Sequence, residues 1–147
     1  MKNILFISSP GGHWIQLLRI AGNLSCENCD IAISSTYEKF ESKFKYFNIN
    51  DFNRNNFIFG IINIIPKLIK IKSEFSPNLV ITTGAAPGLI ALIFFKMFNV
   101  KVLWIDSLAN SEKVSMSARV AQLFSITVLT QWDLLETNKI KYKGRVL

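Results

Sequence analysis

Short, unbroken apolar runs alternate along the chain with segments in which apolar residues recur every three or four positions. The runs predict buried strands at 4–7, 30–34, 44–49, 78–82, 100–105 and 126–130. The helical spacing predicts helices at 14–21, 57–75, 85–98 and 114–124, and a short one at 131–137. Apolar strands that alternate with helices are typical of a parallel sheet covered on both faces. We therefore expect an α/β fold, with one doubly wound, Rossmann-like parallel sheet in a single domain spanning 1–147.

Smaller signals refine this outline. Thr36 is expected to cap a helix in the charged segment that follows it, and the polar stretch 51–56 is expected to be a loop. Pro66 should kink the helix at 57–75 or mark the start of a new one. The run at 141–147 looks strand-like, and the sequence contains neither an internal repeat nor a linker.

The chain is basic: 17 Lys and Arg face 10 Asp and Glu, which gives a net charge of +7. This charge favours an anionic partner, such as nucleic acid, an acidic membrane face or a phosphorylated substrate. No nucleic-acid-binding motif accompanies the lysines, so nucleic acid is the weakest of the three. The longest apolar stretches, 57–65 and 85–95, are shorter than the roughly 20 residues of a spanning helix. Any membrane contact is therefore expected to be peripheral.

The two cysteines are Cys26 and Cys29. A single CxxC without a second pair or nearby histidines is weak support for zinc. We expect two ordinary loop thiols in a reducing cytoplasm, and neither a metal nor a cofactor.

Three polar segments follow predicted strands: 8–13, 82–88 and 106–111. Ligands of doubly wound sheets bind at the carboxyl ends of the strands, which is where these segments should lie. The turn Ser8-Ser9-Pro10-Gly11-Gly12 either presents backbone N–H groups to an anion or only makes a tight connection. It matches neither the dinucleotide-binding GxGxxG pattern nor the Walker sequence.

His13 is the only histidine and follows the two glycines at the start of a predicted helix. There, its imidazole could hydrogen-bond a phosphate or accept a proton from a sugar hydroxyl. The helix N-terminus favours the neutral ring that a general base needs. The alternative is a polar surface residue or a hydrogen-bonded core residue.

These residues carry a resemblance. Ser9-Pro10-Gly11-Gly12-His13, followed by Gln16-Leu17-Leu18, resembles the opening of family 28 glycosyltransferases. More narrowly, it resembles the fourteenth asparagine-linked-glycosylation protein and its PssD-like bacterial relatives. Three later stretches fit that group in order: 81–85 (ITTGA), 106–110 (DSLAN), with Ser115 and Ser117 beyond it, and 130–135 (TQWDLL). Asp106 stands where the group has Glu, and Asn110 where it has Arg.

The resemblance implies the N-terminal, acceptor-binding half of a GT-B glycosyltransferase, with the donor-binding half on a separate polypeptide. The implied reaction is inverting transfer from a UDP-sugar to a polyprenyl-diphosphate-linked saccharide at the cytoplasmic face of the membrane, as in capsule, exopolysaccharide or lipid-linked oligosaccharide synthesis. His13 or Asp106 would deprotonate the acceptor hydroxyl. The acceptor would be bound by Ser9, Gly11, Gly12, Thr83, Gly84 and Asn110. Asp106 has an alternative role as a helix cap or loop carboxylate.

The resemblance also implies two contact surfaces, one for the membrane and one for the partner subunit. A membrane contact is expected on an apolar helix face with adjacent lysines: Ile58, Ile61, Ile62, Ile65, Lys67, Lys70 and Lys72. The alternative is a core helix with a lysine edge. The partner subunit is expected to contact Gln131, Trp132, Val146 and Leu147, which lie after the last core strand. Two rival functions remain: a non-catalytic membrane scaffold for the donor subunit, and a stand-alone nucleotide-binding domain.

Overall fold

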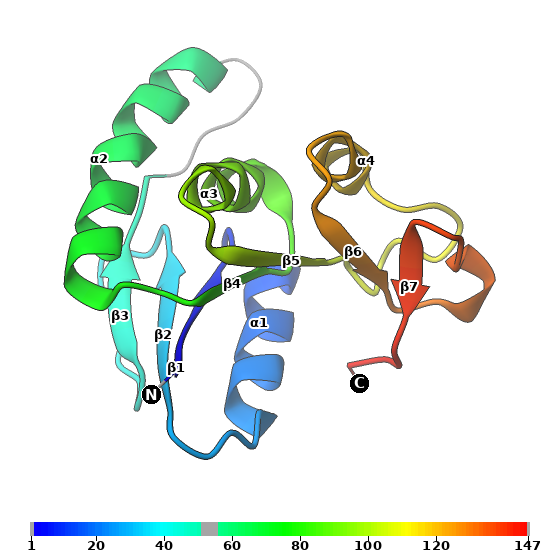
Figure 1. Ribbon diagram of the computed structural model, residues 1–147, viewed down its shortest axis with the longest axis horizontal. Coiled ribbons are helices and arrows are strands. Elements are labelled where there is room, and N and C mark those ends of the chain that lie inside the picture. Colours follow the sequence, from blue (N-terminus) through cyan, green and yellow to red (C-terminus); the bar gives the residue numbers. More distant parts are fainter. Residues whose placement is uncertain (1, 51–55, 147) are drawn as a thin grey trace.

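The computed structural model describes residues 2–50 and 56–146, and within them seven strands form one parallel sheet (Figure 1). The spatial order is β3-β2-β1-β4-β5-β6-β7, so the chain direction across the sheet switches between β1 and β4. Ligands of such sheets bind beside this switch, at the carboxyl ends of the strands. The strands are β1 (Lys2–Ile7), β2 (Cys29–Ser35), β3 (Lys45–Asn48), β4 (Leu79–Thr82), β5 (Lys101–Ile105), β6 (Thr127–Thr130) and β7 (Ile140–Tyr142).

Helices cover the two faces of the sheet unequally (Figure 1). The helices are α1 (Gly12–Asn23), α2 (Phe57–Phe75), α3 (Ala85–Met97) and α4 (Met116–Leu123), and a 3₁₀ turn, η2, spans Asp133–Leu135. Successive side chains of β1 point to opposite faces of the sheet. Phe6 belongs to the core cluster under α1, whereas Leu5 belongs to the core cluster under the other three helices. The α/β sheet expected from the apolar runs is therefore confirmed, with one helix on one face and three on the other.

Of two expected helices, one does not form among the described residues and the other is much shorter than expected. The segment after Thr36 is irregular up to β3, because it is held by side chains instead of helical hydrogen bonds. The carbonyl of Tyr37 accepts from the Tyr46 hydroxyl at 2.6 Å and from Asn48 Nδ2 at 2.7 Å. The expected helix at 131–137 is reduced to η2. By contrast, α2 continues without a break through Pro66.

The ends of two further predictions lie outside the described residues. The strand-like run at 141–147 is β7 only to Tyr142, and Leu147 is not described. Most of the loop expected at 51–56 is likewise not described. Among the described helices, none is long and apolar enough to cross a membrane.

The expectation of two free thiols is wrong, because Cys26 and Cys29 form a disulfide. A tight turn between them, with Asn28 in the left-handed region at φ 60°, brings their Cα atoms to 5.6 Å. That separation lies within the usual span of a disulfide. The bridge joins the end of the loop after α1 to the first residue of β2.

Candidate functional site

His13 is bonded to the end of β4 by two reciprocal hydrogen bonds. Its Nδ1 lies 2.8 Å from the carbonyl oxygen of Thr83, and the Thr83 hydroxyl donates to the His13 carbonyl at 2.6 Å. A carbonyl can only accept, so Nδ1 carries the proton and Nε2 keeps its lone pair when the ring is neutral. The side chain thus presents the nitrogen that a general base uses.

Gly84 makes room for this ring. A Cβ atom at Gly84 would lie 2.5 Å from both Cε1 and Nδ1 of His13, which is closer than real contacts allow. The residue also has φ 139°, a backbone region that favours glycine. The turn after β4 therefore needs glycine because the imidazole occupies the space of a side chain.

A small cavity of about 260 Å³ lies where three helices begin. His13 is in the first turn of α1, Ala85 begins α3, and Met116 begins α4. None of these three first turns contains an acidic residue, and the starts of α1 and α3 have no side-chain cap. Helix N-termini carry partial positive charge and free N–H groups, so this arrangement suits an anion. The lining residues are His13, Ala85, Ser107, Ala109, Asn110, Ser115, Met116 and Ser117.

Asp106 is buried behind this cavity with both carboxylate oxygens in hydrogen bonds. It accepts from Trp104 Nε1 at 3.1 Å, from the Ser115 hydroxyl at 2.7 Å, from the Ser115 N–H at 2.8 Å and from Asn110 Nδ2 at 3.2 Å. Ser115 in turn caps α4 by accepting from the Ala118 N–H. These contacts suit the loop-carboxylate alternative, and a catalytic role for Asp106 stays a prediction.

The structure brings together only part of the expected acceptor site. Thr83 and Gly84 contact His13, and Asn110 lines the cavity. Ser9 and Gly11 lie before α1, Gly12 is its first residue, and none of the three lines the cavity. Sequence reasoning did not assign the other lining residues to the site: Ala85, Ser107, Ala109, Ser115, Met116 and Ser117. Ser107 lies in the stretch 106–110 that carried the resemblance, so its motif could have identified it.

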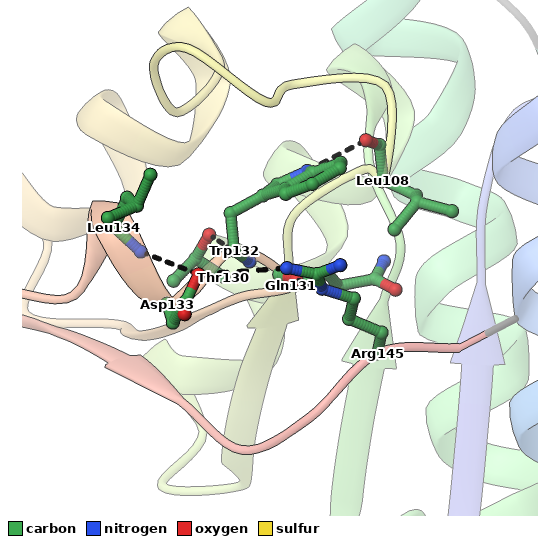
Figure 2. A network of polar contacts seen from close by, with 7 residues as sticks. All are labelled: Leu108, Thr130, Gln131, Trp132, Asp133, Leu134 and Arg145. Atoms are coloured by element: carbon green, nitrogen blue, oxygen red, sulfur yellow. Dashed lines mark hydrogen bonds and ion pairs between the residues drawn. The ribbon is translucent and has the colours of Figure 1, made fainter.

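Gln131 and Trp132 hydrogen-bond to the loop at 106–110, three residues of which line the cavity. Figure 2 shows the contact of Trp132 with Leu108 in this loop. Gln131 is buried: its Nε2 donates to the Asp106 carbonyl at 2.9 Å, and its Oε1 accepts from the Val146 N–H at 2.9 Å. Trp132 Nε1 donates to the Leu108 carbonyl at 2.8 Å. Of the two residues, only Trp132 is partly exposed.

Arg145, which the sequence did not identify, covers the indole of Trp132 (Figure 2). Its guanidinium carbon lies 4.4 Å from the ring centroid, within the range of a cation–π contact. Its Nε donates to the Gln131 carbonyl at 3.1 Å, and its terminal nitrogen lies 3.6 Å from Asp133. The segment after β7 therefore packs against Gln131 and Trp132, which follow the carboxyl end of β6. Val146 is half-buried there.

The expected membrane residues of α2 divide between two faces. Ile58 and Ile62 are exposed, and Phe59 is exposed beside them, whereas Ile61 and Ile65 are half-buried. The core face is formed by Ile64, Leu68, Ile71 and Phe75. Lys67 and Lys70 are exposed, and Lys72 is half-buried against another helix end. The helix thus has an apolar core face and a second apolar stripe that faces outward.

No group of three or more His, Cys, Asp or Glu residues capable of holding a metal is present in the described part of the chain.

Comparisons with known proteins support the fold. No protein-family model matches the sequence, and no curated protein matches it either. Among solved structures, MurG from Acinetobacter baumannii matches with a TM-score of 0.73 and 16% identity, covering 100% of this chain and 46% of MurG. A glycosyltransferase from Rickettsia africae matches with a TM-score of 0.66 and 17% identity, covering 98% of this chain and 43% of that one.

A UDP-N-acetylglucosamine 2-epimerase from Rickettsia bellii is also similar, with a TM-score of 0.64 and 12% identity over 99% of this chain and 45% of the epimerase. The chain thus spans a little under half the length of each of these proteins. Its fold is the Rossmann-like α/β fold of one half of a GT-B enzyme.

Proposed function

We propose that this chain is the acceptor-binding, membrane-recruiting half of a glycosyltransferase whose donor-binding half is a separate polypeptide. The observation that carries the proposal is the placement of His13. Its ring is fixed by Thr83 and Gly84 through Nδ1, which leaves Nε2 as the nitrogen with a lone pair, at a cavity where three helices begin. That constellation lies on the fold of a GT-B half, at the edge where such sheets bind ligands.

The proposed acceptor is a saccharide linked to a lipid diphosphate. The uncapped first turns of α1 and α3 contain no acidic residue and offer N–H donors to the diphosphate. Ser9, Gly11, Gly12 and Gly84 belong to these two helix starts, next to the cavity lining, and are proposed to contact the same group. Asn110 also lines the cavity and contributes a side-chain amide.

In the proposed reaction, His13 Nε2 accepts the proton of the acceptor hydroxyl. The hydroxyl oxygen forms a bond to the anomeric carbon of a UDP-sugar, while the bond from that carbon to the UDP oxygen breaks with inversion. General-base assistance of this kind contributes roughly 10²–10⁴-fold in rate. Asp106 is a positioning residue that does not touch the substrate itself. Its carboxylate oxygens accept hydrogen bonds from Asn110 in the cavity loop and from Ser115 at the start of α4.

A UDP-sugar is the proposed donor class, which the similarity to a UDP-N-acetylglucosamine 2-epimerase supports. The exposed stripe of Ile58, Phe59 and Ile62 on α2 supports peripheral attachment to the cytoplasmic face of the membrane. A lipid-linked acceptor stays in the bilayer, so its binding half has to reach the membrane surface.

The experiment is reconstitution with the candidate donor half. We expect no transfer by this chain alone, transfer when the partner is added, and at least a hundredfold loss in His13→Gln with unchanged partner affinity. Arg19→Gln, an exposed change on the same helix, is the matched control. Turnover by the chain alone would contradict the two-chain proposal.

Full activity in both His13→Gln and Asp106→Asn would favour the scaffold alternative. Calorimetric binding of a UDP-sugar to the isolated chain would favour a stand-alone nucleotide-binding domain.

A further inference from the structure

The disulfide between Cys26 and Cys29 closes only a short loop. The two cysteines are three positions apart, so the bridge spans a single tight turn. The chain-entropy gain from a disulfide grows with the length of the loop that it closes, so a ring this small contributes little. Both cysteines are also held without the bridge, because each packs against the core cluster under α1. A structural role therefore explains little of why this bridge is present.

The chemistry of the pair favours a reversible bond. A CxxC spacing in an α/β fold is typical of proteins that exchange thiols and disulfides. The proposed function places the protein at the cytoplasmic face of the membrane, and disulfides in that compartment are mostly transient, catalytic or redox-sensing. Cys26 and Cys29 are both partly exposed, so the bridge is accessible to a small thiol in solution.

A cavity of about 590 Å³ lies beside the bridge, where β1, β2 and β3 begin and α2 ends. Cys29 lines this cavity, whereas Cys26 is not among its lining residues. The strands are parallel, so their first residues lie at the edge of the sheet opposite the candidate site. A ligand bound here would therefore not compete with one bound beside His13.

The cavity presents charges of both signs. Lys43 and Lys45 line it and are exposed, and neither forms an ion pair with another described residue. Asp30 and Glu74 also line it, and Glu74 lies 3.6 Å from Lys70. A small peptide thiol such as glutathione carries carboxylates and an ammonium group, so the lining offers partners for both.

We propose that Cys26 and Cys29 form a reversible thiol–disulfide exchange site for a zwitterionic peptide thiol that binds in this cavity. The ligand thiolate attacks Sγ of Cys29, and the bond between the protein sulfurs breaks with its electron pair on Cys26 Sγ. A second ligand thiolate attacks the ligand sulfur of the mixed disulfide and releases the Cys29 thiolate. The protein thiolates take up the two protons that the ligand thiols lost. The protein disulfide is reduced, the ligand is oxidised to its own disulfide, and the reverse sequence closes the bridge.

The first test follows the full chain in buffers with fixed ratios of reduced to oxidised glutathione. Alkylation with a maleimide reagent then counts the free thiols, since the chain has no other cysteine. We expect the bridge to open and close reversibly with the glutathione ratio while the circular dichroism of the folded protein stays the same. A bridge that stays closed in excess reduced glutathione, or thiols that stay free in excess oxidised glutathione, would overturn the exchange site.

Single-cysteine variants identify the sulfur that carries the ligand. In oxidised glutathione, Cys26→Ser should gain the mass of one glutathione at Cys29 about threefold or more faster than Cys29→Ser gains it at Cys26. The reason is that Cys29 lines the cavity. An equal or faster reaction at Cys26 would show that attack does not take place from this cavity.

The role of the cavity is tested with thiols of different charge. Lys43→Gln, Lys45→Gln should slow reduction by glutathione about threefold or more at low salt, because the carboxylates of the ligand lose their partners. Reduction by the neutral thiol 2-mercaptoethanol should not change. Lys139→Gln, Lys141→Gln is the matched control, since both lysines are exposed and lie outside this cavity.

The same change with both thiols, or no change with either, would overturn the cavity as the ligand site. These assays contain neither a donor nor an acceptor sugar, so their failure leaves the transferase proposal to the reconstitution assay. A failed reconstitution likewise leaves the measured exchange unaffected.

Discussion

The imidazole of His13 rests against Gly84, so two motifs separated by about 70 residues form a single structural unit. The turn after β1 supplies the ring, and the turn after β4 supplies the space and the hydrogen-bond acceptor. β1 and β4 are neighbours in the sheet, with Ile7 opposite Thr82, which sets the two turns side by side. A substitution in either turn should therefore alter the structure of the other turn.

Gly84→Ala should displace the His13 ring and strain the backbone. We expect destabilisation of about 1–3 kcal/mol, since a non-glycine residue is disfavoured at φ 139°. Denaturant unfolding measures the loss, and the ring resonances of the sole histidine report its displacement. Gly22→Ala is the control: nothing lies within 4 Å of a Cβ there, and alanine in a helix is favoured by up to about 1 kcal/mol. Unshifted histidine resonances in Gly84→Ala would show that the ring does not depend on this contact.

The tautomer of His13 is a separate prediction. When the ring is neutral, nitrogen NMR should show the proton on Nδ1 and a bare Nε2, because Nδ1 donates to the Thr83 carbonyl. Thr83→Val keeps that carbonyl and removes the hydroxyl that donates to the His13 backbone, so the tautomer should persist. A neutral ring protonated on Nε2 in wild type would contradict the assignment of this nitrogen as the base.

Asp106→Asn should destabilise the fold by about 3 kcal/mol, because a buried carboxylate that accepts from Trp104 and Ser115 is lost. Ser115→Ala removes the cap of α4 and should cost about 1–2 kcal/mol. Ser117→Ala, also at the cavity, should stay within about 0.5 kcal/mol of wild type. Thermal or denaturant unfolding ranks the three variants. An Asp106→Asn protein as stable as Ser117→Ala would remove Asp106 from its positioning role.

Trp132→Ala should weaken association with the donor subunit by about 2 kcal/mol, within the range of interface hot spots. Trp132→Phe keeps a ring for Arg145 and loses only the hydrogen bond to Leu108, so it should bind the partner nearly as well as wild type. Titration of the partner against both variants measures this difference. Equal affinity for Trp132→Ala and wild type would assign the indole to loop support alone.

Burial raises the pKa of Tyr46 from 10.0 to about 12. The folded protein therefore keeps a proton that the unfolded chain releases near pH 10. The stabilisation from this group is complete below pH 10 and disappears as the pH rises towards 12. The difference in tyrosinate absorbance between wild type and Tyr46→Phe should show a transition near pH 12. A transition near pH 10 would mean that the Tyr46 hydroxyl is not buried in the folded protein.

The sequence was sufficient for the sheet because its signals are local. Apolar runs such as 4–7 and spacing such as that of 57–75 are set by burial of a strand or of one helix face. The segment after Thr36 could not be predicted, because its conformation depends on Tyr46 and Asn48 in β3. The Cys26–Cys29 bridge likewise depends on the turn between them.

The candidate site was predicted in part for the same reason. His13 and the Thr83–Gly84 turn stand out because each follows a predicted strand, and parallel strands end at one edge. Their direct contact is a tertiary feature that no local pattern encodes. Arg145 is one of several basic residues near the end of the sequence, and only its contacts with Trp132 and Gln131 in the folded protein distinguish it from Lys139, Lys141 and Lys143.

The hydrogen bonds of Gln131 also impose an order on the assembly of this protein. Its side chain joins the Asp106 carbonyl to the N–H of Val146, and 40 residues separate the two in the chain. Synthesis proceeds from the N-terminus, so the loop at 106–110 leaves the ribosome well before the segment that braces it. The sheet can form around β1 and β4 early, whereas this wall of the cavity gains its full support only after residue 146 has emerged.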